Sequence, residues 1–215
     1  MSWSRQGVRL PFTDRDEAGR LLAEELVPLG LDDPLVLALP RGGVPVGREI
    51  ARRLDAPLDV LVTRKIGCPG QPELGVGAIA EGGEPVFDAD LMGRVGLTPA
   101  DVEETVRRER AELARRVTAY RGDRALPSVE DRDVVVVDDG LATGGTARAA
   151  LAAVRAGRPR RLVLAVPVGA AQTVKALAGE ADDIVVLAAP WTFRAVGQWY
   201  VRFDQLSDAD VQRLL

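Results

Sequence analysis

The feature of this sequence that most constrains its fold is a run of four valines at 134–137, followed directly by two aspartates. Such a run has no polar face, so it predicts a strand that is buried on both faces of a sheet. Ligands of open α/β sheets bind beyond the carboxyl ends of strands of this kind. Asp138 and Asp139 therefore stand where a polar ligand would be expected.

Short apolar runs alternate with helical patterns along the rest of the chain. Five strands are predicted, at 35–39, 58–63, 134–137, 162–166 and 184–187. Helices are predicted between and beside them, from a cap at Thr13 or Asp14, at about 44–54, 98–120 and 146–156, around 174–177, and from a cap at Ser207. This alternation implies an α/β fold, with helices on both faces of a parallel sheet of about five strands, in one domain at 1–215.

The composition excludes several kinds of chemistry. With no His and one Cys among 215 residues, the chain has no Ser–His–Asp triad, Cys–His pair, disulfide framework or structural zinc site. Its net charge of −4 argues against non-specific nucleic-acid binding, which needs a basic surface. No apolar run approaches the length of about 18 residues that a membrane span needs, and residues 1–5 do not read as a leader. We therefore expect a cytoplasmic protein without nucleic-acid or membrane partners.

The segment after the valine run carries the chemistry. Thr-Gly-Gly-Thr at 143–146 opens the next helix, so its backbone N–H groups and two hydroxyls can bind a phosphate at the helix N-terminus. The adjacent carboxylates of Asp138 and Asp139 can accept hydrogen bonds from a vicinal diol, and keeping both ionised requires a cation or hydroxyl partners. This one segment thus offers a site for a sugar phosphate.

The segment resembles the signature with which type I phosphoribosyltransferases bind phosphoribosyl pyrophosphate (PRPP): a hydrophobic strand, two acids, a spacer and Thr-Gly-x-Thr. The resemblance implies that Asp138 and Asp139 hold the ribose hydroxyls of PRPP, directly or through Mg²⁺. It also implies that the following loop binds the rest of the ribose phosphate, through Gly140, Ala142, Thr143, Gly144, Gly145 and Thr146.

A second motif, Pro40-Arg41-Gly42-Gly43, follows the first predicted strand and resembles the pyrophosphate loop of the same family. In that loop, small residues such as Gly42 and Gly43 let backbone N–H groups approach pyrophosphate. The resemblance implies a cis peptide bond between Pro40 and Arg41, and a role for Arg41 in stabilising the leaving group.

A third motif, Arg64-Lys65-Ile66-Gly67, resembles the Arg-Lys-x-Gly of adenine- and xanthine-type enzymes. It opens a glycine-rich stretch at about 64–83, which we predict to be a mobile loop that closes over pyrophosphate. Arg64 and Lys65 would then neutralise the leaving pyrophosphate. Glu73 and Glu81, within the same stretch, are candidate proton acceptors.

The remaining assignments concern the acceptor. A small hood over the site is expected from about 188–205, where Phe193 is the candidate for stacking on a base; an ordinary core role for Phe193 stays open. Hypoxanthine-guanine enzymes carry an Asp in the phosphate loop that contacts the purine, and this chain has Ala142 there, as adenine-type enzymes do.

Taken together, the resemblance covers about 35–215 and is nearest to an uncharacterised bacterial branch of the family, marked also by Glu-Gly-Gly at 81–83. It implies a homodimeric pentosyltransferase of nucleotide metabolism that moves the 5-phosphoribosyl group from Mg²⁺-bound PRPP to a nitrogen acceptor such as a nucleobase and releases pyrophosphate. Two alternatives stay open: a non-catalytic PRPP sensor, and a hydrolase of PRPP or another ribose phosphate.

Overall fold

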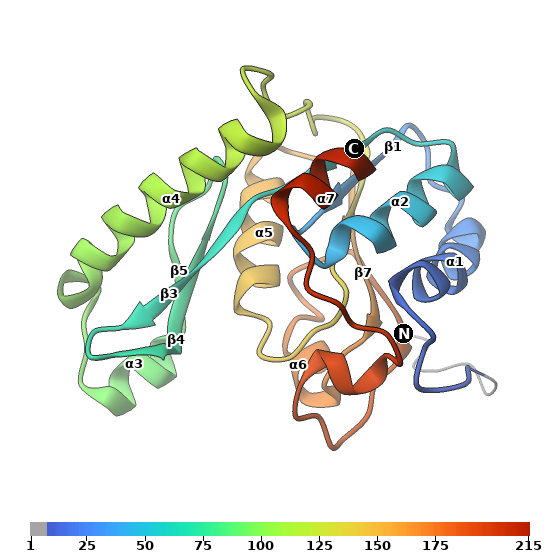
Figure 1. Ribbon diagram of the computed structural model, residues 1–215. Coiled ribbons are helices and arrows are strands. Elements are labelled where there is room, and N and C mark those ends of the chain that lie inside the picture. Colours follow the sequence, from blue (N-terminus) through green and yellow to red (C-terminus); the bar gives the residue numbers. More distant parts are fainter. Residues whose placement is uncertain (1–7) are drawn as a thin grey trace.

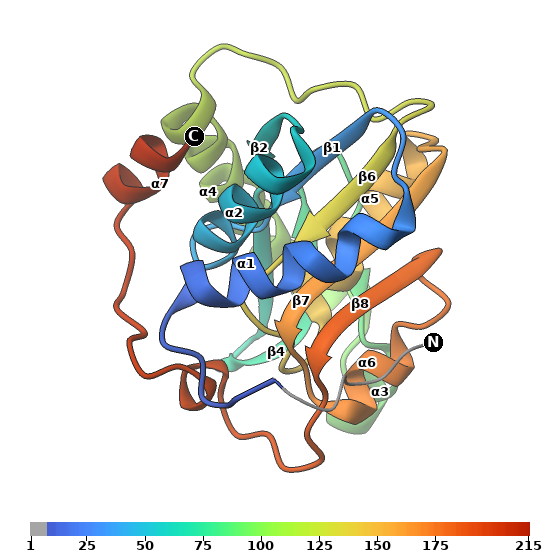
Figure 2. The same cartoon turned by 90° about the vertical axis from the view of Figure 1, so that its right-hand side faces the viewer.

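The computed structural model describes residues 8–215, so residues 1–5, to which the expectation about a leader refers, lie outside the described residues. At its centre is a parallel sheet of five strands in the order β2-β1-β6-β7-β8 (Figures 1 and 2). The strands are β1 Pro34–Ala38, β2 Leu58–Val60, β6 Asp133–Val137, β7 Arg161–Val168 and β8 Asp183–Ala188. The predicted α/β class and the five predicted strands are confirmed.

Helices cover both faces of the parallel sheet (Figure 2). Two of them, α1 and α2, lie on one face and α5 lies on the other. The bounds are α1 Arg15–Leu26, η1 Val27–Leu29, α2 Gly43–Leu54, α5 Gly145–Ala156, α6 Ala171–Ala176, η3 Val196–Trp199 and α7 Asp208–Leu214. No helix within residues 8–215 is both long enough and apolar enough to cross a membrane.

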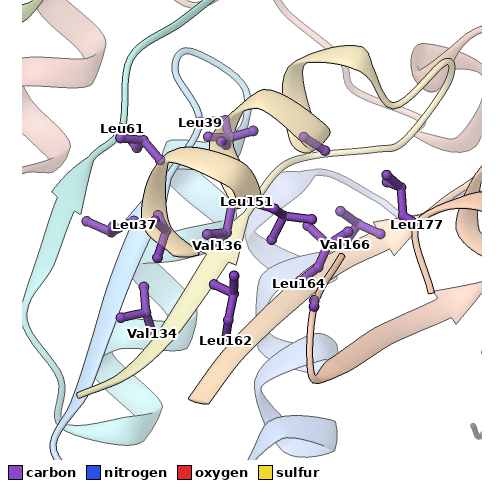
Figure 3. Packing of buried hydrophobic residues seen from close by; sticks show 14 of the residues in the cluster. Leu37, Leu39, Leu61, Val134, Val136, Leu151, Leu162, Leu164, Val166 and Leu177 are labelled. Carbon is purple, nitrogen blue, oxygen red and sulfur yellow. The ribbon is translucent and has the colours of Figure 1, made fainter. Parts of the chain in front are cut away.

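The four valines of β6 show why the run has no polar face. Val134 and Val136 pack in the core beneath α5, together with Leu151 of that helix (Figure 3). Val135 and Val137 point the other way, into the core beneath α1 and α2. All four are fully buried, so β6 is the central strand and its carboxyl end is fixed from both faces.

A second, antiparallel sheet of three strands forms a small hood beside α5, on the side away from α1 (Figure 1). Its strands are β3 Thr63–Cys68, β4 Gln71–Ala80 and β5 Val86–Phe87, and it is accompanied by α3 Ala89–Val95, η2 Pro99–Val102 and α4 Glu103–Arg121. Ala78 and Ala80 of β4 pack against Ala149 of α5. These small side chains allow the hood to lie close to the helix.

The prediction that 64–83 is an irregular loop is wrong, because most of this stretch is the β3–β4 hairpin. Lys65 pairs with Ala78, and the register shifts between Ile66 and Cys68. Such pairing depends on residues of the opposite strand. A glycine-rich strand also lacks the alternation of apolar and polar residues by which a strand is recognised in a sequence. The mobility of the hairpin stays a prediction.

The segment at 188–205 begins at Ala188, the last residue of β8, and adds no further strand, only a single bridge between Tyr200 and Phe12. It passes close to the end of β6, since a Cβ atom at Gly140 would lie 2.5 Å from a side-chain atom of Val196. Whether this segment also covers an acceptor, as the sequence suggested, stays a prediction.

Arg121, at the end of α4, joins the hood to the parallel sheet. Its guanidinium donates to both carboxylate oxygens of Glu81 at 2.6 Å and to Asp59 of β2 at 3.3 Å. The Arg121 side chain is 1% exposed. Burial raises the pKa of Glu81, and the charge of Arg121 opposes that shift. The hood is therefore attached through a buried ion pair.

Replacing Arg121 by Met should destabilise the protein by about 3–5 kcal/mol, because the buried Asp59 and the partly buried Glu81 would lose their counter-charge. Urea unfolding measures this change. The matched control is Arg116→Met on the same helix, whose ion pair with Glu112 is more exposed and should cost less than about 1 kcal/mol. Equal losses in the two variants would contradict the role given to Arg121.

Candidate functional site

The two glycine-containing loops that follow β1 and β6 lie against each other. The strands are parallel neighbours, with Ala38 opposite Val137, so both end at the same edge of the sheet. A Cβ atom at Gly42 would lie 1.9 Å from Oδ2 of Asp139, and one at Gly43 would lie 2.6 Å from the Val137 carbonyl oxygen. Only glycine fits there, and the structure thus brings the predicted pyrophosphate loop and the two acids together.

The peptide bond between Pro40 and Arg41 is cis, as the resemblance to the pyrophosphate loop implied. The side chain of Arg41 is partly exposed and lies 4.0 Å from Asp208 of α7.

Asp138 and Asp139 are adjacent acids in a largely buried place. The Nε atom of Arg15 donates to Oδ2 of Asp139 at 2.8 Å, and the Asp139 N–H donates to the Asp138 carboxylate at 2.8 Å. Burial raises the pKa of Asp138, and the neighbouring Asp139 charge raises it further. Burial also raises the pKa of Asp139, while Arg15 opposes this shift. A ligand that brings hydroxyl donors or a cation would therefore stabilise the ionised form of these two carboxyl groups.

Tyr200 supports the same turn from the 188–205 segment. Its hydroxyl donates to the backbone carbonyl of Asp139 at 2.6 Å. Burial raises the pKa of Tyr200, so the hydroxyl remains a donor at neutral pH. The backbone that carries the acid is thus held in place.

The predicted phosphate loop is anchored at Leu141, whose buried side chain packs in the core under α5. The Leu141 N–H donates to Val168, and its carbonyl accepts from the Ala170 N–H, so the loop is tied to the end of β7. Ala142 and Thr143 are exposed, and Gly144 has a φ of 79°, which suits glycine.

From Gly145 the chain continues as α5. The first N–H groups of a helix have no partner within it, so Gly145 and Thr146 present donors to an anion. The hydroxyl of Thr173 in α6 donates to the Ala142 carbonyl at 2.6 Å and holds the loop from outside.

Lys65 of the hood comes close to this loop. Its side chain lies along Gly75, and its ammonium donates to the Glu73 carbonyl. A pocket of about 110 Å³ separates the hairpin from the phosphate loop. It is lined by Lys65, Gly75, Gly77, Val86, Phe87, Asp88, Thr143, Gly145, Thr146 and Arg148. The structure therefore places the predicted lid lysine beside the predicted phosphate site.

The other predicted site residues have different neighbours. Arg64 forms an ion pair with Glu109 of α4 at 2.8 Å, within the hood. Glu81 is bound to Arg121, as described above, and Glu73 is exposed on β4. Phe193 is half-buried, and its ring lies 5.9 Å from that of Trp199. The structure does not bring these four side chains into one cluster.

Sequence reasoning missed Arg15 and Thr173. Arg15 is one of 26 arginines and lies far from every motif, and Thr173 is the third residue of a short helix without a distinctive pattern. Tyr200 lies in the segment at 188–205 but belongs to none of the sequence motifs. No signal in the sequence links these residues to the loop at 138–146.

The comparisons with known proteins point to one protein family. The model of the "Phosphoribosyl transferase domain" family matches residues 15–197. A Mycobacterium tuberculosis (H37Rv) protein named "Putative phosphoribosyl transferase Rv0571c" is 47% identical over 204 residues, which are 95% of this chain and 46% of that protein. This chain thus spans about half the length of that curated relative.

Among solved structures, TT1426 from Thermus thermophilus is similar with a TM-score of 0.81 and 45% identity, over 95% of this chain and 97% of that one. The AQ2163 protein from Aquifex aeolicus shares the fold, with a TM-score of 0.52 and 14% identity, over 81% of this chain and 74% of that one.

Replacing Thr173 by Val should weaken the binding of ribose 5-phosphate about five- to tenfold, because the Ala142 carbonyl loses the hydrogen bond that orients the loop. Thr173→Ser keeps the hydroxyl and should bind like the wild type. Isothermal titration calorimetry measures both. The control is Thr118→Val, which removes a similar hydroxyl–carbonyl bond on the surface of α4. Equal affinities in Thr173→Val and the wild type would contradict the assigned role.

Proposed function

Because this chain belongs to the phosphoribosyl transferase domain family, we propose that it transfers the 5-phosphoribosyl group of Mg²⁺-bound PRPP to a nitrogen acceptor, with release of pyrophosphate. The observation that carries the proposal is the contact between Gly42 and Asp139. It brings the loop proposed for pyrophosphate against the acid proposed for the ribose, next to a helix N-terminus that suits the 5′-phosphate. A nucleobase is the proposed acceptor.

Each part of PRPP has a proposed partner at this edge of the sheet. Asp138 and Asp139 accept hydrogen bonds from the ribose hydroxyls, and the loop from Gly140 to Thr146 binds the 5′-phosphate through backbone N–H groups and two threonine hydroxyls. Gly42 and Gly43 allow the backbone to approach pyrophosphate. Four or five such charge-assisted hydrogen bonds, each worth roughly 1.5–3 kcal/mol, suffice for a polar ligand.

The donor set at 138–139 fits Mg²⁺. This ion prefers oxygen ligands and commonly takes one or two carboxylates, with water and substrate oxygens completing its shell. Asp138 and Asp139 would hold it, through the hydroxyls of PRPP. When bound, the ion supplies positive charge that stabilises the leaving pyrophosphate.

In the proposed reaction the bond between C1′ and the pyrophosphate oxygen breaks as a bond from C1′ to the acceptor nitrogen forms on the opposite face. Pyrophosphate leaves with the bonding electrons, and the acceptor gives up a proton. Arg41 and Lys65 stabilise the negative charge on the leaving group, and the transition state resembles an oxocarbenium ion. No nucleophilic side chain is required.

The hood and the segment at 188–205 supply the other groups. Arg64 contributes positive charge once it leaves Glu109 as the hairpin closes. Of the two proposed proton acceptors, Glu81 has both oxygens bound to Arg121, so we assign the role to Glu73. Phe193 is proposed to stack on the base. A homodimer and a cytoplasmic location stay predictions, the first of which light scattering would check.

The first test is calorimetric titration of PRPP with Mg²⁺, repeated with EDTA. We expect micromolar binding that EDTA abolishes. Asp138→Asn should lose this binding while the melting temperature stays at or above that of the wild type, because one of two adjacent buried acids becomes neutral. Asp123→Asn, in an exposed turn, is the control.

Failure of the folded wild type to bind PRPP would refute the proposal. Binding without pyrophosphate release in the presence of any nucleobase would instead support the sensor alternative, and release without a base would support the hydrolase.

A second test concerns the lid. Lys65→Ala should lower kcat by at least about tenfold, with little change in the Kd for PRPP, because the ammonium acts mainly on charge that develops in the transition state. The control is Lys175→Ala on α6, which removes the only other lysine of the chain. Equal losses in kcat and in affinity would contradict a lid that acts on the leaving group. Pyrophosphate-release assays and calorimetry provide the two values.

A further inference from the structure

Arg15, the first residue of α1, reaches the site from outside every motif found in the sequence. Its Nε atom donates to Oδ2 of Asp139, and its Nη1 atom donates to the Asp204 carbonyl at 3.0 Å. Its guanidinium lies over the ring of Phe203, 3.8 Å from the centroid. Only 11% of the side chain is exposed. Three contacts therefore hold Arg15 in one orientation.

The position of Arg15 in the first turn does not stabilise α1 itself. A cation in the first turn of a helix meets the positive end of the helix dipole, which favours acids there. The other charged residues of the first turn of α1 are acidic, Asp16 and Glu17, and its cap is Asp14. Arg15 is thus the exception, and the partner that compensates for it is Asp139, at the end of a different element.

The Asp139 carboxylate is confined between Arg15 and the loop at 41–43. The oxygen that accepts from Arg15, Oδ2, is also the atom that leaves no room for a Cβ at Gly42. Tyr200 fixes the backbone carbonyl of the same residue. A ring contact between Tyr200 and Phe203 at 5.1 Å joins this support to the one that holds Arg15.

We propose that Arg15 is a positioning residue of the ligand site, which holds the Asp139 carboxylate against the loop at 41–43 and so keeps the diol-binding acids and the pyrophosphate loop in one relative placement. The inference rests on the proposed function for the identity of the ligand. Such an arrangement lowers the ordering cost of binding, because both halves of the site are in place before the ligand arrives.

The test compares Arg15→Met, Arg15→Lys and the control Arg20→Met, an exposed arginine of the same helix. Calorimetry with Mg²⁺ and PRPP should show affinity lowered about tenfold or more in Arg15→Met, the effect of losing one charge-assisted hydrogen bond. Arg15→Lys should recover part of it, since lysine keeps the charge and lacks the planar fork. Arg20→Met should bind like the wild type.

A ligand-free measurement separates this proposal from the proposed function. In ¹⁵N-labelled protein without ligand, Arg15→Met should shift or broaden the backbone amide signal of Gly42, and Arg20→Met should leave it unchanged. An unchanged Gly42 signal in Arg15→Met would overturn the proposal. So would a shifted signal with wild-type affinity for PRPP.

If the wild type binds no PRPP, the proposed function fails, and the Gly42 signal alone decides whether Arg15 positions the acid. A shifted signal would then uphold the positioning role for whatever ligand the site takes.

Discussion

The parallel pairing of β1 with β6 is the constraint on which the rest of the site depends. Their register ends both strands at the same edge, and the loops that follow begin in contact. Because Asp139 lies against Gly42, neither loop can change without the other. Helix α5, which begins within the second loop, and the hood that packs on α5 take their positions from the same pair of strands.

Charge at this edge is balanced by groups from distant parts of the chain. Asp139 meets Arg15 from α1, and its backbone is held by Tyr200 from the C-terminal segment. On the other side of the loop, Thr173 fixes the Ala142 carbonyl. In a buried place such partners matter more than on the surface, because an unpaired acid there would be neutral or strongly destabilising. The polar site is therefore supported by the tertiary structure on every side.

The strands and motifs could be predicted because their signals are local. The apolar residues of a run such as 134–137 are enough to indicate a buried strand, and the spacing of acids, glycines and threonines in 138–146 suits the sugar phosphate that we propose as ligand. The β3–β4 hairpin could not be predicted in this way. Its strands are rich in glycine, and what orders them is pairing with each other and packing of Ala78 and Ala80 on α5. The ion-pair partners of Arg64 and Glu81 could not be predicted for the same reason. These partners, Glu109 and Arg121, both lie on α4, far from Arg64 and Glu81 in the sequence.

The sequence by itself determined the fold class, the five parallel strands and the loops of the candidate site, because hydrophobic runs and glycine-rich turns act on neighbouring residues. Only the tertiary structure decided which charges meet. Arg15 and Asp139 are separated by 124 residues, and whether such groups pair depends on how helices dock onto the sheet. Hydrophobic burial sets that docking without regard to the charges, so the counter-charges of a buried site become visible only when the chain is folded.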